Sequence, residues 1–360
     1  MGIAAWLFGL WEKGFQQICE QPYPNPPTDR KPPIRKNPAT GEHYMDLRVL
    51  TYNVAGLPWP FLKARAGPLA QIGHDLAEMR RNGTAPDIVL IQEGFRSSTE
   101  NLIINSGYPY WAAGPLTDSK ADESRSFVPE QFKRERKFTK GETFGKIMGS
   151  GLFILSEWPI IAKHMEPFFD GACAGFDSGA NKGVMWADID INGLPDCVQV
   201  FNTHLNSRGA SGVTSQRSLQ AHQLQFRQAA EFSQKHWRRD APFIFGGDFN
   251  IKDSPPRIEH IRGYDFGGEH DPRTAGELIY FYCPNADCCS FKNNTVPPDQ
   301  PLQHQDWQGW CHGDRVRVKA LLLENIFTPV DARGFAVRGR QCLSDHDGVL
   351  VHYRLSWIPD

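Results

Sequence analysis

The chain lacks an excess of basic residues, and this bears on what it binds. Its 39 lysines and arginines are balanced by 41 aspartates and glutamates, so the formal net charge is -2. Proteins that bind duplex nucleic acid usually carry a basic stripe that neutralises phosphates. The composition therefore disfavours a duplex-binding protein. The densest basic run, residues 133–137, contains a glutamate and is typical of a solvated loop or helix face.

Long apolar runs are also missing. The run nearest the N-terminus, residues 3–11, is only nine residues long, whereas a helix that crosses a bilayer needs about 20. No basic residue precedes it, as one would in a secretory signal peptide. Its aromatic and leucine residues recur at near-helical spacing. We expect a short amphipathic helix on the domain or on a membrane surface, with an atypical signal peptide as the alternative, and no transmembrane segment.

The eight cysteines lack the spacing of a zinc site. Cys283, Cys288 and Cys289 cluster and Cys311 precedes a histidine, but the ligands are not paired. Free thiols, one or two disulfides and a structural zinc stay open, so cysteine usage assigns no compartment. We expect a soluble or peripheral membrane protein.

What the chain does contain is a set of short apolar runs that end in polar side chains. Five runs of β-branched and apolar residues are bounded by glycine, proline or polar residues, which predicts strands. The polar groups at their ends are Asn53, Glu93, His204, Asp248 with Asn250, and Asp345 with His346. A single such group usually stabilises a turn. Five from distant parts of the chain predict one pocket, suited to a divalent ion and a phosphate ester.

Helical periodicity separates these strands. Apolar residues recur at helical spacing over residues 68–81 and 215–237, so each stretch predicts a helix between two strands. Strands separated by helices indicate a layered α/β architecture. The length allows a large core, and the motifs span about 300 residues without an internal linker. One catalytic domain is therefore favoured.

The ordered motifs resemble a known superfamily. Tyr52-Asn53, Gln92-Glu93, Thr203-His204-Leu205, Gly247-Asp248-Phe249-Asn250 and Ser344-Asp345-His346 are similar to the endonuclease/exonuclease/phosphatase superfamily, which has the deoxyribonuclease I-like fold. The resemblance covers about residues 46–355. It implies a four-layer α/β/β/α sandwich of two packed, mostly antiparallel sheets. Residues 149–160 and 181–187 are similar to the bacterial neutral sphingomyelinases, the second stretch more weakly.

The resulting domain division has two parts. Residues 1–45 are predicted to be an N-terminal amphipathic segment and a proline-rich tether. Residues 46–356 form a single catalytic domain with loop excursions at 114–148 and 253–313. The second excursion is rich in aromatic residues and is expected to influence substrate choice, or to form a small aromatic core on the domain. We expect a monomer.

The resemblance implies a phosphoric ester hydrolase that uses Mg²⁺, with Mn²⁺ or Ca²⁺ as alternatives. Glu93, Asn53 and Asp345 are the expected metal residues, because magnesium prefers oxygen ligands. The expected reaction is in-line attack of water on phosphorus, assisted by the metal, in a phosphodiesterase of sphingomyelinase C-like type.

Catalytic and substrate roles fall to the remaining motif residues. By resemblance, His346 is the general base. Asp248 would orient the water or His346, Asn250 would donate to a phosphoryl oxygen, and His204 would contact the phosphoryl group. These four are the expected catalytic residues, and the expected substrate-binding residues are Lys182 and Asn202.

One position departs from the family pattern. Members carry an aspartate, in a strand before the final motif, that orients the terminal histidine. The matching strand here is taken as residues 317–323, where Lys319 stands at the aspartate position. Asp314 or Asp248 would then have to orient His346.

Three functions remain open. A phospholipid-cleaving phosphodiesterase, acting at a membrane surface, is favoured by the sphingomyelinase-like stretches. The alternative is a nuclease or an inositol-phosphate or nucleotide phosphatase, since one fold hosts many activities. The third possibility is that the protein is not an enzyme but an inactive scaffold that binds lipid or a partner.

Overall fold

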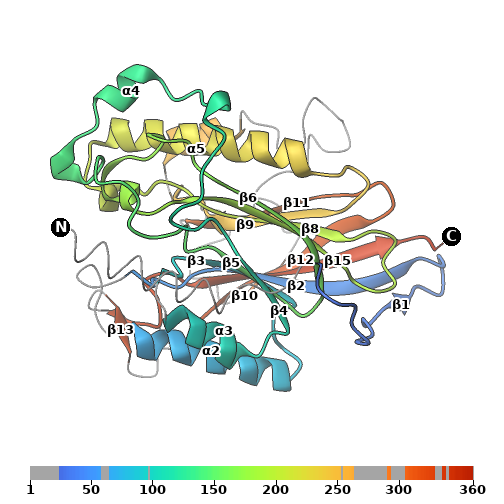
Figure 1. Cartoon of the computed structure of the whole chain (residues 1–360). Helices are drawn as coiled ribbons and strands as arrows, with labels where there is room; N and C mark the ends of the chain where they lie inside the picture. Colours follow the sequence, from blue (N-terminus) through green and yellow to red (C-terminus); the bar gives the residue numbers. More distant parts are fainter. Residues whose placement is uncertain are drawn as a thin grey trace.

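The computed structural model describes residues 24–57, 65–95, 98–252, 254–262, 290–292, 305–328, 335–337 and 340–359. Within these residues, two β-sheets pack face to face and helices cover their outer faces (Figure 1). The arrangement confirms the predicted α/β/β/α sandwich. Pairing is mostly antiparallel, and the parallel pairs β2–β3, β8–β9 and β10–β12 make both sheets mixed.

The larger sheet has eight strands in the described part of the chain, in the order β10-β12-β15-β2-β3-β5-β4 with β1 paired to β2. Its strands are β1 (Arg35–Lys36), β2 (His43–Asn53), β3 (Ile88–Gln92), β4 (Tyr110–Ala113), β5 (Phe153–Ser156), β10 (Ser290–Lys292), β12 (Arg317–Ile326) and β15 (Gly348–Trp357).

The smaller sheet has five described strands in the order β11-β9-β8-β7-β6. They are β6 (Ile160–Pro167), β7 (Gly183–Ile189), β8 (Val198–His204), β9 (Phe243–Asp248) and β11 (Asp306–Cys311). A separate hairpin pairs β13 (Ala336–Val337) with β14 (Arg340–Gln341).

Helices flank the two sheets, with α2 and α3 below and α4 and α5 above in Figure 1. Their bounds are α2 (Ala66–Arg81), α3 (Ser98–Ser106), α4 (Glu130–Arg134), α5 (Ser215–His236) and α6 (Pro255–Arg262). Short 3-10 turns are η1 (Glu123–Arg125), η2 (Phe138–Lys140), η3 (Gly175–Gly179) and η4 (Gly209–Ser211). The two helices predicted from periodicity are confirmed as α2 and α5. None of the helices described here has the length and apolarity needed to cross a membrane.

The main core lies between the sheets because strand side chains alternate between faces. In β2, Leu47 and Val49 point into the inter-sheet core, where Val200 and Ile244 of the smaller sheet also pack. Tyr52 belongs instead to the core under α2 and α3. Strands buried on both faces explain the nearly continuous apolar runs in the sequence.

Part of the predicted tether packs on the domain. The backbone N–H of Asn25 donates to Ile160, and its side-chain oxygen accepts from the N–H of Ile160 at 2.8 Å. Arg30 pairs with Glu157 and lies 4.7 Å over the ring of Trp158. Residues 24–30 are therefore fixed to the domain at these points. The predicted amphipathic helix lies outside the described residues.

The predicted excursion at 253–313 needs correction. Residues 306–311 are β11, a strand of the smaller sheet that pairs along β9. Most of the aromatic stretch, with Cys283, Cys288 and Cys289, lies outside the described residues. Cys311 is buried. The excursion at 114–148 contains η1, α4 and η2 rather than loop alone.

Candidate active site

The strand ends that carry the motifs meet at one edge of the sandwich. The parallel pairs β2–β3 and β8–β9 bring their carboxyl ends to this edge. A cavity of about 620 Å³ opens there. Every predicted site residue except Asn53 and Asn202 lines it, namely Glu93, Lys182, His204, Asp248, Asn250, Asp345 and His346. The predicted convergence of distant motifs is therefore present in the fold.

The close approach of β8 and β9 places His204 beside Asp248. Gly247 has φ +148°, and a Cβ atom there would lie 2.2 Å from the carbonyl oxygen of Thr203. Only glycine fits this contact. The Nε2 atom of His204 lies 3.4 Å from Oδ2 of Asp248. Gly247 thus allows the close approach of β8 and β9 that places His204 beside Asp248.

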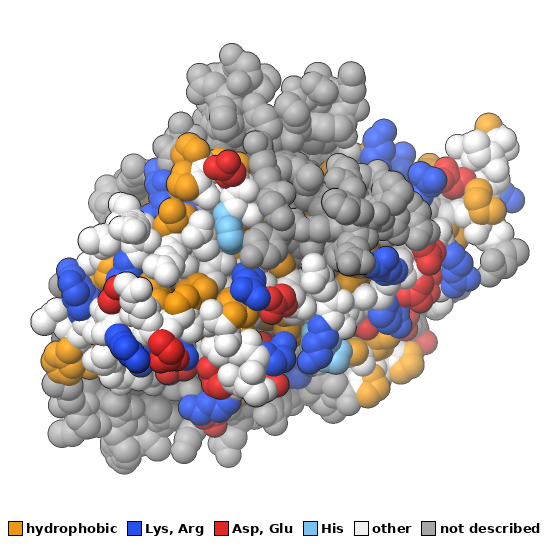
Figure 2. Space-filling model, turned by 90° about the horizontal axis from the view of Figure 1, so that it is seen from above, with side chains coloured by type: hydrophobic (Ala, Val, Ile, Leu, Met, Phe, Trp, Pro, Cys, Tyr) orange, Lys and Arg blue, Asp and Glu red, His pale blue; other side chains and the backbone are white. Residues whose placement is uncertain are grey.

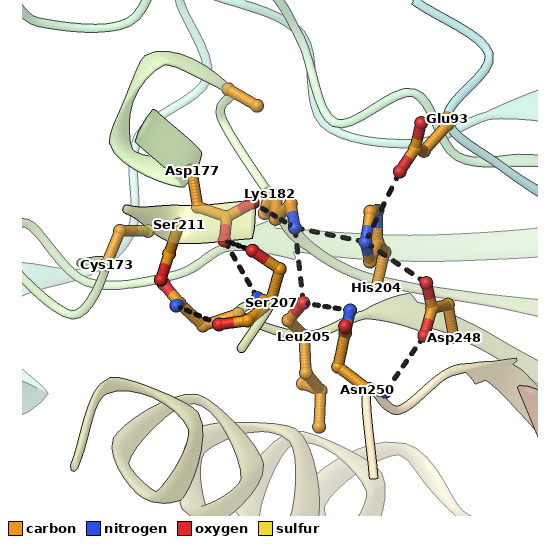
Figure 3. Close-up of polar contacts among 12 residues, drawn as sticks. Glu93, Cys173, Asp177, Lys182, His204, Leu205, Ser207, Ser211, Asp248 and Asn250 are labelled. Atoms are coloured by element: carbon orange, nitrogen blue, oxygen red, sulfur yellow. Dashed lines mark hydrogen bonds and ion pairs between the residues drawn. The ribbon is translucent and has the colours of Figure 1, made fainter. Parts of the chain in front are cut away.

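Lys182 is buried at the start of β7 and faces His204 (Figure 3). Its Nζ atom lies 3.0 Å from Nε2 of His204 and 2.6 Å from Oδ1 of Asp177, and it donates to the carbonyl of Leu205 at 3.1 Å. Burial, followed by the charges of Lys182 and His346, lowers the pKa of His204 well below its usual value. His204 is therefore neutral and accepts a hydrogen bond from Lys182.

Asn250 and Arg257 fix the loops that follow β8 and β9. Asn250 lies in the left-handed region at φ 52°, which is costly for a residue other than glycine. Its backbone N–H donates to Asp248 at 2.8 Å, and its side-chain amide donates to Leu205 at 3.0 Å. The buried guanidinium of Arg257 donates to the carbonyls of Asn206 and Asn250. Strain at Asn250 is thus held in place by polar contacts.

Glu93 follows β3 and enters the cavity from the larger sheet. It has φ 57°, another left-handed position. The Nε2 atom of His204 lies 4.0 Å from its Oε1 atom, but a neutral imidazole supplies no charge to pair with it. Burial, together with the charge of Asp345, raises the pKa of Glu93 to about 7. A negative charge at this carboxylate is therefore poorly compensated by the protein.

Asn53 links the two carboxylates rather than opening into the cavity. Its amide nitrogen donates to Glu93 at 3.2 Å and to Asp248 at 2.9 Å, while its oxygen accepts from the N–H of Ala55. Because that oxygen is already engaged, the structure places Asn53 as a support for Glu93. The place of Asn53 among the metal residues, through its oxygen or through a metal-bound water, stays a prediction.

The loop carrying Asp345 and His346 is tied to the end of β2. The hydroxyl of Ser344 donates to the carbonyl of Asn53 at 2.6 Å. The buried guanidinium of Arg65 donates to the carbonyls of Val54 and Leu343. These contacts hold the last motif against the strand that supports Glu93, although 291 residues separate Ser344 from Asn53.

His346 is oriented by Asp306, a residue that the sequence did not reveal. The Nδ1 atom of His346 lies 2.6 Å from Oδ2 of Asp306, and its Nε2 atom lies 3.9 Å from Asp248. Burial opposes the charged imidazole, but the charges of Asp306, Asp248 and Asp345 outweigh it and raise the pKa of His346 well above its usual value. Asp306 also stands opposite Asp248 in the β11–β9 register.

The inferred departure at Lys319 is therefore wrong. Lys319 is an exposed residue of β12, paired with Arg354 in the register of the larger sheet. The orienting aspartate lies instead at the start of β11. The sequence of this strand, Asp306-Trp307-Gln308-Gly309-Trp310, is polar and aromatic rather than aliphatic. The signal that could have revealed Asp306 was an acidic residue at the start of a short strand in which polar and aromatic residues alternate.

Asn202 lies between the sheets and not at the cavity. Its amide donates to the carbonyls of Ile91 and Phe153, and its oxygen accepts from Gln92 at 2.7 Å. These bonds satisfy a buried amide and join β8 to β3 and β5. The structure therefore gives Asn202 a supporting place and not the expected contact with substrate.

The donor set at the larger sheet suits a hard divalent cation. Glu93 and Asp345 both line the cavity, and the raised pKa of Glu93 shows that added positive charge would be favourable there. Asp248, Asp306 and His346 also lie close, with ligand atoms within 4.8 Å of one another. Because Nδ1 of His346 is bound to Asp306, this second group fits an acid–base pair better.

A phospholipase C from Staphylococcus aureus is 31% identical over 175 residues, which is 47% of this chain and 51% of that protein. The chain thus matches about half the length of this curated relative.

Two solved structures share the fold. Sphingomyelinase C from Streptomyces griseocarneus aligns with TM-score 0.56 at 19% identity, covering 85% of this chain and 99% of that chain. A beta toxin variant from Staphylococcus aureus with bound magnesium ions aligns with TM-score 0.55 at 18% identity, covering 86% and 99%. Residues 50–346 match the Endonuclease/Exonuclease/phosphatase family. The chain belongs to the Endonuclease/Exonuclease/phosphatase family.

Proposed function

We propose that this protein is a magnesium-dependent phosphodiesterase of sphingomyelinase C-like type, which hydrolyses the headgroup phosphodiester of a phospholipid. The observation that carries the proposal is the convergence of Glu93, His204, Asp248 and His346 on one cavity. Carboxylates that favour a cation face two histidines in different environments, and this combination suits attack of water on an anionic phosphate ester.

The smaller sheet would hold the phosphoryl group. Lys182 and His204 present a cation and an imidazole to the cavity, next to the side-chain amide of Asn250. A bound phosphodiester brings negative charge beside His204, which raises the pKa of His204 toward the proton-donating form. His204 would then protonate the leaving oxygen as the bond from phosphorus to that oxygen breaks.

His346 would accept the proton of the attacking water. Asp306 accepts the Nδ1–H hydrogen bond, so Nε2 is directed toward the cavity and Asp248. The new bond joins the water oxygen to phosphorus, opposite the leaving oxygen. The surrounding carboxylates favour a charged His346, so the imidazole must lose a proton before it can act as a base.

Magnesium would be held by Glu93 and Asp345, with Asn53 keeping Glu93 in place. When bound, it supplies positive charge to the non-bridging phosphoryl oxygens and, beside His346, favours the neutral imidazole. The donor set of oxygen ligands is the kind that magnesium prefers.

The choice of a phospholipid rests on relatives of this chain. The curated relative is a phospholipase C, and one structural neighbour is a sphingomyelinase C. A second neighbour carries magnesium ions. The near-neutral composition gives no support to duplex binding.

A substrate panel with magnesium tests the proposal. Sphingomyelin, phosphatidylcholine, a lysophospholipid, duplex DNA and inositol phosphates are incubated with the protein, with a chelator as control. We expect a phosphorylated headgroup to be released from a choline lipid and chelation to abolish release. Nicking of DNA or release of inorganic phosphate, with no lipid turnover, would contradict the proposed substrate.

A further inference from the structure

Three large aromatic side chains are exposed near the cavity mouth. Phe138, Phe144 and Phe176, which we call the aromatic rim, are 57%, 50% and 52% exposed. The rings of Phe138 and Phe144 meet edge to face with centroids 4.5 Å apart. A soluble protein rarely exposes neighbouring large apolar groups unless they form a contact surface.

The aromatic rim is continuous with the cavity. The side chain of Phe176 lines the cavity with Ile147. Gly141 has φ +77°, and a Cβ atom there would lie 3.5 Å from Phe176 and 3.8 Å from Phe144. The two rings thus converge over this glycine. Apolar surface therefore leads from the exterior to the site where the phosphate ester would bind.

Figure 2 shows the face above the α4–α5 layer. Figure 2 shows a compact group of hydrophobic side chains at the left margin of this face, on the side where α4 lies in Figure 1. Further groups of hydrophobic side chains lie near the centre and the upper left of this face, with charged side chains between them. The face is therefore not uniformly apolar.

Buried polar contacts fix the backbone beneath the aromatic rim. The carboxylate of Glu142 accepts from the N–H groups of Lys137 and Gly175, at 2.7 and 3.0 Å. It also accepts from Nε of Arg217 on α5, at 2.7 Å. One buried carboxylate thus joins the segment of Phe138 and Phe144 to the turn that carries Phe176. The rings are exposed from a fixed scaffold, which reduces the entropic cost of binding.

The charges beside the aromatic rim are basic. Lys137 and Lys140 flank Phe138, and Lys146 follows Phe144. Glu142 is the one acidic residue in positions 136–147, and it is buried against Arg217. Phe138 and Phe144, flanked in sequence by lysines, complement a surface of acyl chains and anionic headgroups.

We propose that the aromatic rim docks the protein on a phospholipid bilayer that contains anionic lipid. Phe138 and Phe144 insert at the level of the headgroups and upper acyl chains, and Lys137 and Lys140 contact lipid phosphates. Phe176 then adjoins both the bilayer and the cavity, so a headgroup can enter without leaving the interface. The choice of a bilayer over a protein partner rests on the proposed function.

Vesicle binding and turnover of a soluble ester test this together. The full chain and a Phe138→Ser/Phe144→Ser variant are sedimented with phosphatidylcholine vesicles containing phosphatidylserine. We expect the variant to bind about tenfold more weakly, since two rings lose their apolar contact. Its kcat/KM on a water-soluble choline phosphodiester should stay unchanged, while its hydrolysis of vesicle lipid should fall with binding.

Matched variants separate a surface effect from a folding effect. Ile104→Ser removes a side chain that is 62% exposed on α3, which covers the other sheet, and should leave vesicle binding unchanged. Lys137→Glu/Lys140→Glu should weaken binding to anionic vesicles and leave circular dichroism unchanged. Unaltered vesicle binding in both double variants would overturn the inference.

Two further outcomes are distinguishable. Equal loss of vesicle binding and of soluble-ester turnover in the phenylalanine variant would show that the rings support the cavity, and would overturn the docking surface. Rim-dependent vesicle binding by a protein that hydrolyses no phosphodiester would support docking while it contradicts the proposed function.

Discussion

The two sheets contribute different sets of side chains to the cavity, and we call these sets its two halves. On the smaller sheet, His204, Asp248 and Asn250 each meet a partner supplied by the protein, at 3.0 Å or less for Lys182 with His204 and for Asn250 with Asp248. On the larger sheet, burial and Asp345 raise the pKa of Glu93 to about 7. Burial and the charge of Asp306 also raise the pKa of Asp248. The halves therefore differ in how their side chains are held: close contacts fix the smaller-sheet groups, while Glu93 becomes more favourable when a cation binds.

This difference assigns tasks to the sheets. A fixed set of donors can stabilise charge without rearrangement when a phosphoryl group arrives, which is an effective form of catalysis. A poorly compensated carboxylate instead favours capture of a cation. Asn53 joins the halves, because its amide donates both to Glu93 and to Asp248.

The largest expected effect separates the halves by metal response. Glu93→Gln should lower kcat/KM by about a thousandfold and remove the rise in Tm that magnesium causes in the unmodified protein. His204→Gln should lower kcat/KM by about the same factor but keep that rise in Tm. Thermal melts with and without magnesium, beside initial rates, check both variants. A magnesium-induced rise in Tm that survives in Glu93→Gln would break the comparison.

A smaller effect is expected at the orienting carboxylate. Asp306→Asn should lower kcat by about a hundredfold, because Nδ1 of His346 loses an ionised acceptor. Loss of that charge also lowers the pKa of His346, so its titration moves to lower pH, measurable by NMR of the imidazole. Asp314→Asn, which changes the acid that the sequence offered as a substitute, is the matched control. Equal rates in the Asp306 variant and the unmodified protein would refute this role.

Arg257 tests whether the smaller-sheet half depends on its fixed loops. Arg257→Met removes donors from the carbonyls of Asn206 and Asn250, so we expect about a tenfold loss of kcat and about 2–4 kcal/mol of stability. KM for the diester should change less than kcat, and the magnesium-induced rise in Tm should persist. Arg227→Met on exposed α5 surface is the control. A change in KM alone would point to a role in substrate binding.

The smallest expected effect is on the pH dependence of stability, through the buried His222 in the core next to the smaller sheet. Burial and Arg257 lower the pKa of His222 well below its usual value, so the folded state keeps the imidazole neutral. The unfolded state binds a proton below pH ~6.5, so stability falls as pH drops through that value, by about 1.4 kcal/mol per pH unit for this group. Denaturant melts between neutral and acidic pH should show a shallower fall in His222→Asn.

The fold and most of the site could be predicted from local patterns. The runs ending at Asn53, Glu93, His204 and Asp248 carry both strand signal and chemistry, because a buried strand must be apolar until it reaches the cavity edge. Their convergence follows from parallel pairing, which brings carboxyl ends together. The helices α2 and α5 were predictable from periodicity, because each buries one face and its apolar residues therefore recur at helical spacing.

The remaining features depend on register and on contacts between distant segments. Asp306 faces His346 because β11 pairs with β9 and places Asp306 opposite Asp248, a register that no local pattern specifies. Asn202 shares a strand face with His204, yet packing between the sheets occupies its amide. Lys319 was assigned from the aliphatic run of β12, where its side chain is exposed and away from the cavity.

One measurement tests the central claim most directly, that a cation-binding half and a fixed catalytic half together drive attack of water on phosphorus. The protein is supplied with sphingomyelin or phosphatidylcholine in water labelled with the heavy isotope of oxygen, with magnesium or with a chelator. The account predicts magnesium-dependent release of a phosphorylated headgroup that carries the label. Label in the lipid product instead, or release that persists after chelation, would contradict it.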